Sequence, residues 1–75
     1  MDKLIRILEA LHPDVDFANT DGLVDKKILD SFDIINIITE ISEEFDVVVP
    51  AEEIAPENFN SARALWSLIE RLENE

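Results

Sequence analysis

The stretch that decides the fold reads LDSFDIINIITEISEEF and covers residues 29–45. Its large apolar side chains return every three or four residues, which is the spacing of one face of an α-helix. The predicted buried stripe consists of Ile34, Ile35, Ile38, Ile41 and Phe45. Acidic and amide side chains fall on the other side of the same helix. The pattern predicts a helix over 31–45 that begins at Ser31.

Ser31 lies where a polar connector gives way to this helix. A serine hydroxyl at a helix N-terminus either caps the free backbone N–H groups or carries a phosphate that these groups and the helix dipole stabilise. On spacing alone, capping is the more ordinary role. The choice between the two roles decides the function.

Three further helices are predicted around this one. Apolar residues at helical spacing indicate a first helix over 2–12, which Pro13 ends. A loop over 13–30 follows, rich in turn-forming residues and anchored by Phe17, Leu23, Val24, Ile28 and Leu29. A short helix is expected over 50–55, between Pro50 and Pro56, and a last helix over 60–72, capped by Asn60 or Ser61 with Leu65, Trp66, Ile69 and Leu72 facing inward. The expected fold is all-α: a single domain over 1–75 that forms a four-helix bundle with a long first loop and a short third helix.

The composition narrows the classes of partner. Eighteen acidic residues against six lysines and arginines give a formal net charge of −12, which repels nucleic acid and anionic lipid and favours basic protein partners. Because the chain has no cysteine, it has no thiolate of its own. Charged residues interrupt the apolar run near the N-terminus, and no run is long enough to span a membrane. We therefore expect a soluble, cytoplasmic monomer that does not insert into membranes.

Few residues suit catalysis or metal binding. His12 has no cysteine or second histidine to complete a metal site, and Trp66 lies at the spacing of a core residue. A calcium loop over 17–28 fails because Phe17 and Ile28 stand where its end positions require acidic ligands. With one histidine, one glycine and no cysteine, the chain also lacks a catalytic triad and a phosphate-binding loop. We expect no enzyme activity and no metal.

Several landmarks around Ser31 resemble those of the acyl carrier protein family. The triplet Asp30-Ser31-Phe32 is similar to the family's Asp-Ser-Leu, and it is followed at matching intervals by Glu-Glu-Phe-Asp at 43–46 and by Val49-Pro50. A lone triplet is a weak signal, but the spaced set in a short acidic chain is a strong one. The resemblance covers nearly the whole chain and implies a four-helix, acyl-carrier-like bundle.

The resemblance implies a function for Ser31. A phosphopantetheinyl transferase would attach 4′-phosphopantetheine from coenzyme A to its hydroxyl, and the arm's thiol would hold acyl or aminoacyl groups as thioesters. Acyl or aminoacyl ligases, synthetases and acyltransferases with basic docking patches would be the other partners. By the same resemblance the partner-facing residues are Asp30, Phe32, Asp33, Asn36, Thr39, Glu40 and Glu43.

Departures from the family pattern bear on the cargo. Lys27 stands where many relatives have glycine, and Asn36 and Ser42 replace acids common in carriers of fatty acid biosynthesis. Two extra residues between Pro50 and Phe59 look like those of D-alanyl and other stand-alone carriers. The cargo therefore stays open. Two other classes remain as alternatives: an unmodified acidic adaptor in which Ser31 only caps its helix, and a calcium-responsive module in the loop over 13–30.

Overall fold

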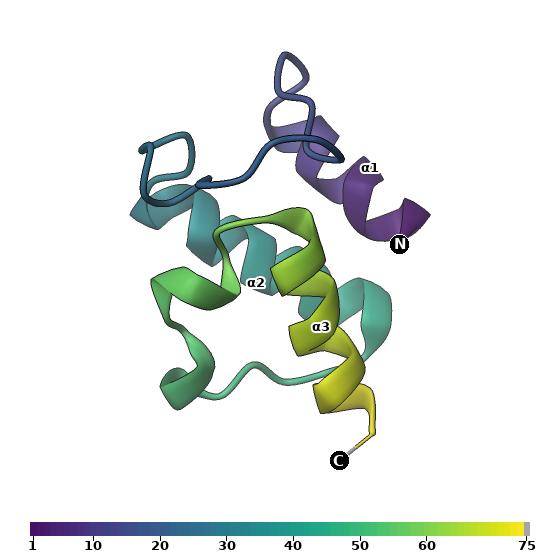
Figure 1. The fold of residues 1–75 in the computed structure, drawn as a ribbon. Helices are drawn as coiled ribbons and strands as arrows, with labels where there is room; N and C mark the ends of the chain where they lie inside the picture. The colour runs from purple at the N-terminus through teal and green to yellow at the C-terminus, as the bar shows by residue number, and fades with distance from the viewer. Residues whose placement is uncertain (75) are drawn as a thin grey trace.

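The computed structural model describes residues 1–74 and contains three α-helices and two short 3-10 turns in that range. The helices are α1 (Asp2–Leu11), α2 (Ser31–Phe45) and α3 (Ala62–Glu73), and the turns are η1 (Ala51–Glu53) and η2 (Pro56–Asn58). The three helices pack on one another, and two long loops join them (Figure 1). The described part of the chain has no β-strand, only an isolated bridge between Asp21 and Ser61. The all-helical prediction is thus confirmed.

The first helix ends where the sequence predicts. The backbone N–H of His12 donates to the Leu8 carbonyl oxygen at 3.0 Å and closes the last turn of α1. Pro13 has no N–H with which to continue the ladder. One face of α1 is apolar, and Leu4 and Leu8 on that face are completely buried.

The bounds of α2 match the prediction, but the predicted buried stripe wrongly includes Ile35 and omits Ile37. Ile37 and Ile41 are completely buried, whereas Ile35 is 60% exposed. At 3.6 residues per turn, Ile37 lies about 40° from Ile41 around the helix axis, whereas Ile35 lies about 120° from Ile41. The true stripe therefore includes Ile37 and leaves Ile35 on the outer surface. The helix stops at Asp46, whose backbone adopts the left-handed conformation (φ 54°).

The segment between α2 and α3 differs from the predicted short helix over 50–55. It forms two separate 3-10 turns, η1 and η2, joined through Ile54 and Ala55. Ala55 is extended (φ −126°, ψ 147°) because Pro56 disfavours the helical conformation of the residue before it. Five residues between two prolines are too few for an α-helix to nucleate and propagate. The four-helix arrangement is therefore not confirmed.

The last helix begins two residues later than predicted. The Ser61 hydroxyl accepts the N–H of Ala64 at 3.0 Å, so Ser61 is the cap and Ala62 the first helical residue. Leu65, Leu68 and Ile69 are completely buried, while Trp66 and Leu72 are half-buried. Trp66 packs edge-on against Phe45 of α2 with ring centroids 5.8 Å apart. It is a packing residue, as its spacing predicts.

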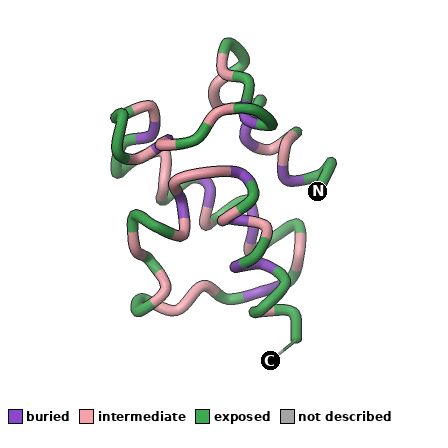
Figure 2. Tube along the Cα trace, viewed as in Figure 1, coloured by how far each residue is buried: buried purple, intermediate pink, exposed green. Residues whose placement is uncertain are grey.

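One apolar cluster joins all three helices to the first loop. Buried positions recur along the helices and in the loops between them (Figure 2). The cluster consists of Leu4, Leu8, Phe17, Leu23, Leu29, Ile37, Ile41, Val47, Phe59, Ala62, Leu65, Leu68 and Ile69. Three of these residues come from the loop over 13–30, which is therefore anchored in the core as predicted.

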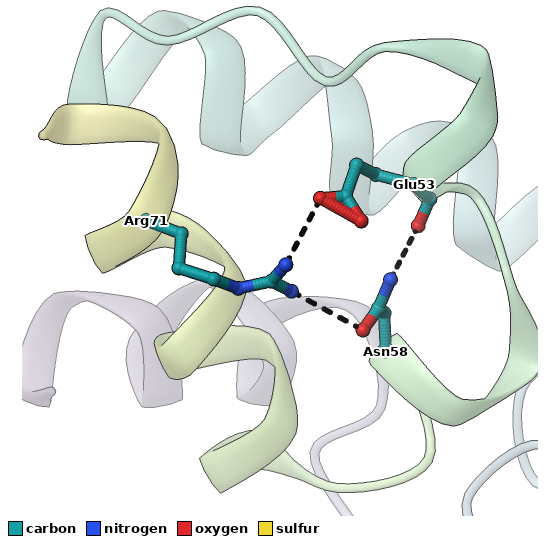
Figure 3. Close-up of polar contacts among 3 residues, drawn as sticks. All are labelled: Glu53, Asn58 and Arg71. Atoms are coloured by element: carbon teal, nitrogen blue, oxygen red, sulfur yellow. Dashed lines mark hydrogen bonds and ion pairs between the residues drawn. The ribbon is translucent and has the colours of Figure 1, made fainter. Parts of the chain in front are cut away.

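Polar contacts fix both loops further. The Asn60 side chain accepts the N–H groups of Val24 and Asp25 at 2.9 and 3.2 Å, which ties the first loop to the start of α3. The Arg71 guanidinium reaches from α3 to the Glu53 carboxylate at 3.1 Å and the Asn58 amide oxygen at 3.4 Å (Figure 3). These contacts hold η1 and η2 against α3. None of the helices in residues 1–74 has the length and apolar character needed to cross a membrane.

Candidate functional site

Ser31 is the first residue of α2 and is exposed to solvent. The first N–H groups of a helix have no acceptor within the helix, and the helix dipole places partial positive charge at this end. Because α2 is a full helix of 15 residues packed on the core, this end is held rigidly. The position therefore suits an anionic group linked to the serine oxygen.

The residue that caps α2 is Asp30, not Ser31. Asp30 Oδ1 accepts the backbone N–H of Asp33 at 2.9 Å, and Asp33 Oδ2 accepts the backbone N–H of Asp30 at 3.1 Å. This reciprocal pair is a capping box. Of the two roles considered for the Ser31 hydroxyl, capping belongs instead to Asp30, because its extended backbone (φ −104°, ψ −175°) brings a carboxylate to the N–H groups one residue earlier.

The consequence is that the Ser31 hydroxyl has no structural task within residues 1–74. It forms no side-chain hydrogen bond there, and it lies between the two aspartates of the capping box. An exposed serine at this position is free to react without unfolding the helix end. This weakens the adaptor alternative in its original form, which gave Ser31 a capping role.

Asp33 has a second contact that the sequence did not predict. Its Oδ2 atom lies 2.9 Å from Nε2 of His12, the residue that ends α1. Burial raises the pKa of Asp33, but the N–H of Asp30 and the nearby imidazole lower it by more, so the pKa lies below its ordinary value. Asp33 is therefore ionised and half-buried. It contacts His12 at the end of α1.

The other residues predicted to face partners lie on the surface of α2. Phe32 is 77% exposed, and Asp30, Asn36, Thr39, Glu40 and Glu43 are also exposed. Ile35, which the sequence placed in the core, is one helical turn from Phe32 on this outer surface. Their i, i+3 spacing in the helix is the sequence feature that could have placed Ile35 on the same surface as Phe32. The two side chains form an exposed apolar pair in an acidic setting.

A groove of about 360 Å³ lies between α1 and α2, away from Ser31. Ile7, Ala10 and Leu11 line it, with charged residues of both helices at its edges. No residue of the first turn of α2 contributes to it. The groove therefore does not extend the site around Ser31.

Polar side chains in the stretch over 17–28, which was weighed as a calcium loop, have partners within the protein. Asn19 donates to the Asp16 carboxylate at 2.9 Å, and the Asp25 carboxylate accepts from Asn60 at 2.8 Å. Within residues 1–74, no three histidine, cysteine or acidic side chains come together in a way that could hold a metal ion. The geometry gives the calcium alternative no support.

Comparison with known proteins finds curated relatives that are named as carriers. Aminoacyl carrier protein 1 of Bradyrhizobium diazoefficiens is 39% identical over 41 residues, which cover 55% of this chain and 46% of that protein, so the match spans about half of that relative's length. The D-alanyl carrier protein of Streptococcus mutans is 29% identical over 73 residues, which cover 96% of this chain and 92% of that protein. No family model and no solved structure matches the chain at a significant level. The resemblance to carrier proteins predicted from the motif around Ser31 is therefore confirmed by two similar proteins that bear that name.

Proposed function

We propose that the chain carries acyl or aminoacyl groups as thioesters on a 4′-phosphopantetheine arm attached to Ser31. The observation that carries the proposal is the exposed Ser31 hydroxyl, which stands at the first residue of α2 without any capping duty. The motif around it and the two relatives named as carriers support the same assignment. The chain itself is a substrate of other enzymes and not a catalyst.

The surroundings of Ser31 fit a phosphodiester. The positive end of α2 favours an anion at this oxygen, and the core holds the helix in place. The chain has no cysteine, so the thiol for a thioester is the chemistry that the arm supplies. The short third helix of a four-helix carrier corresponds, in this proposal, to the segment formed by η1 and η2.

The outer surface of α2 is the proposed docking surface for partner enzymes. It consists of Phe32, Ile35, Asn36, Thr39 and Glu43, with Asp30 and Glu40 at its margins. Its apolar pair would fill a pocket on the partner, while the carboxylates attract basic residues around that pocket. The partners are a phosphopantetheinyl transferase and a ligase or acyltransferase. Both relatives are named for amino-acid cargo, which favours an aminoacyl group over a fatty acyl group.

Intact mass measurement tests the modification. After incubation with coenzyme A and a broad-specificity phosphopantetheinyl transferase, the wild-type chain gains one phosphopantetheine mass and Ser31→Ala gains none. Ser67→Ala is the matched control, because Ser67 is also an exposed helical serine and its loss leaves the gain intact. If the wild-type mass stays unchanged while a known carrier in the same tube is modified, the proposal is wrong.

Charge reversal tests the docking surface. We expect Glu43→Lys to slow modification mainly by lowering the association rate with the transferase. This decrease in rate should become smaller as salt is added, because salt limits electrostatic attraction to about 10 Å at 0.1 M. Glu9→Lys on α1 makes the same charge change away from this surface and serves as the control. Asp33 is unsuitable for this test because its carboxylate belongs to the capping box. Equal rates for both variants at low salt would show that the acidic face of α2 is only solvated.

A further inference from the structure

The single histidine of the chain, His12, connects the end of α1 to the start of α2. Its backbone N–H closes the last turn of α1, which fixes where its side chain leaves the helix. Its ring lies beside Phe17 of the core, with centroids 6.5 Å apart and planes inclined by 58°. The imidazole is thus held in one place against the first turn of α2.

The Nε2 atom of His12 is shielded from solvent and lies 2.9 Å from Oδ2 of Asp33. The contact is not aligned as a hydrogen bond, and within residues 1–74 no other atom provides a hydrogen-bond partner for this nitrogen. A buried polar atom without a partner costs free energy. The Asp33 carboxylate is the polar group that lies against this nitrogen, so the contact between them is the one that limits this cost.

The Asp33 carboxylate is shared between this contact and the capping box. The same Oδ2 atom that faces His12 accepts the N–H of Asp30 at 3.1 Å. The Asp30 carboxylate in turn accepts the N–H of Asp33, and Ser31 lies between the two aspartates in the chain. The orientation of one carboxylate therefore couples the end of α1 to the backbone that presents Ser31.

We propose that His12 is a positioning residue for Ser31: from the end of α1 it holds the Asp33 carboxylate in the orientation that closes the capping box around the serine. Its functional part rests on the proposed modification of Ser31. Without His12 the first turn of α2 opens more often, because Asp33 loses the partner that fixes its rotamer. The modifying enzyme then meets Ser31 in a productive orientation less often.

The charges around the imidazole favour this role. The carboxylates near it in the chain or in space are Asp33 and Asp30 at the start of α2, Glu9 on α1, and Asp14 and Asp16 in the loop. Asp16 is engaged with Asn19, while Glu9 and Asp14 are exposed. Among the described residues no lysine or arginine forms an ion pair with either aspartate of the capping box. His12 is the basic group that this site has.

The test combines a double-mutant cycle with two readouts. The variants are His12→Gln, Asp33→Asn and the double variant, with Glu9→Gln as a control that removes a charge from the same helix. Amide hydrogen exchange by NMR reports on opening of the box at Asp30 and Asp33. The initial rate of modification with coenzyme A and the transferase reports on presentation of Ser31.

We expect His12→Gln to speed exchange of these two amides about fivefold, the effect of losing a partly buried charge contact of about 1 kcal/mol. Modification should slow by a similar factor, because the first turn of α2 presents Ser31 in a productive orientation less often. The double variant should behave like Asp33→Asn alone, since His12 acts through Asp33. Glu9→Gln should match the wild type in both readouts.

The inference is overturned if exchange at Asp30 and Asp33 is the same in His12→Gln and in the wild type, or if the two substitutions have independent, additive effects. If the wild-type chain is not modified at all, the proposed function is wrong, but the exchange data still decide whether His12 closes the box.

Discussion

Replacing Asp30 by alanine should destabilise the chain much more than replacing Ser31 by alanine. Asp30 Oδ1 is the acceptor for the Asp33 N–H at 2.9 Å, so its removal leaves the helix without a cap. Loss of an N-cap costs about 1 kcal/mol, and loss of a carboxylate at a helix N-terminus adds about 0.5 kcal/mol. Ser31 is exposed and forms no side-chain hydrogen bond within residues 1–74, so Ser31→Ala should stay within about 0.5 kcal/mol of the wild type.

Asp30→Asn separates the two contributions. Its amide oxygen can still accept the Asp33 N–H, so only the charge is lost and the cost should be about 0.5 kcal/mol. Asp30→Asn also controls for the loss of repulsion between acidic residues, because both Asn and Ala at this position make the net charge of −12 less negative by one. The difference between Asp30→Ala and Asp30→Asn is therefore the value of the cap itself.

Thermal and urea unfolding of the four proteins give the comparison. For a domain of this size 1 kcal/mol corresponds to about 4–8 °C in Tm, so Asp30→Ala should melt about 6–12 °C below the wild type. The urea midpoint should fall by about 1 M. A Ser31→Ala variant that loses as much stability as Asp30→Ala would refute the assignment of the cap. It would also mean that Ser31→Ala is not a clean test of modification.

Two further predictions concern packing and pH. Ile37→Val should lower the free energy of unfolding by about 1 kcal/mol and Ile35→Val by less than about 0.5 kcal/mol, because Ile37 is buried and Ile35 is exposed. Urea unfolding measures both changes, and equal losses would contradict the assigned buried stripe. The pKa of Asp33 is lower in the folded chain than its ordinary value. Its ionised form therefore stabilises the fold at pH values above the ordinary pKa, and this stabilisation is lost as the pH falls from the ordinary pKa toward the pKa of the folded chain. Asp33→Asn should therefore lower Tm at about pH 7 and much less at about pH 3, and a difference independent of pH would show that the carboxylate charge does not contribute.

The surface of α2 that we propose for docking could be anticipated only in part. The helical spacing of the isoleucines identified α2 and its bounds, and the motif identified Ser31 and the exposed Phe32. The same spacing could not distinguish Ile35 from Ile37, because apolar residues so closely spaced span more of the helix circumference than one buried face. Burial of Ile37 depends on where α1 and α3 lie, and the local sequence does not contain that information.

The spacing of the apolar residues did not decide which residue caps α2. Asp30 and Ser31 are both good caps, and the backbone conformation of a single residue decides which of them is used. Asp30 and Asp33, three residues apart in the sequence, have the spacing of a capping box. The His12 contact had no such signal, because it joins residues 21 positions apart across the long first loop.

By itself, the sequence determined the features that depend on neighbouring residues. Pro13 limits α1, the Ser61 cap starts α3, and the stretch over 29–45 forms α2 because its apolar side chains return at helical spacing. The tertiary structure alone decided which isoleucines are buried, that Arg71 contacts the segment of the two 3-10 turns, and that His12 meets Asp33. The physical reason is range: caps and prolines act within one helical turn, whereas burial and ion pairs depend on distant segments that the core brings together.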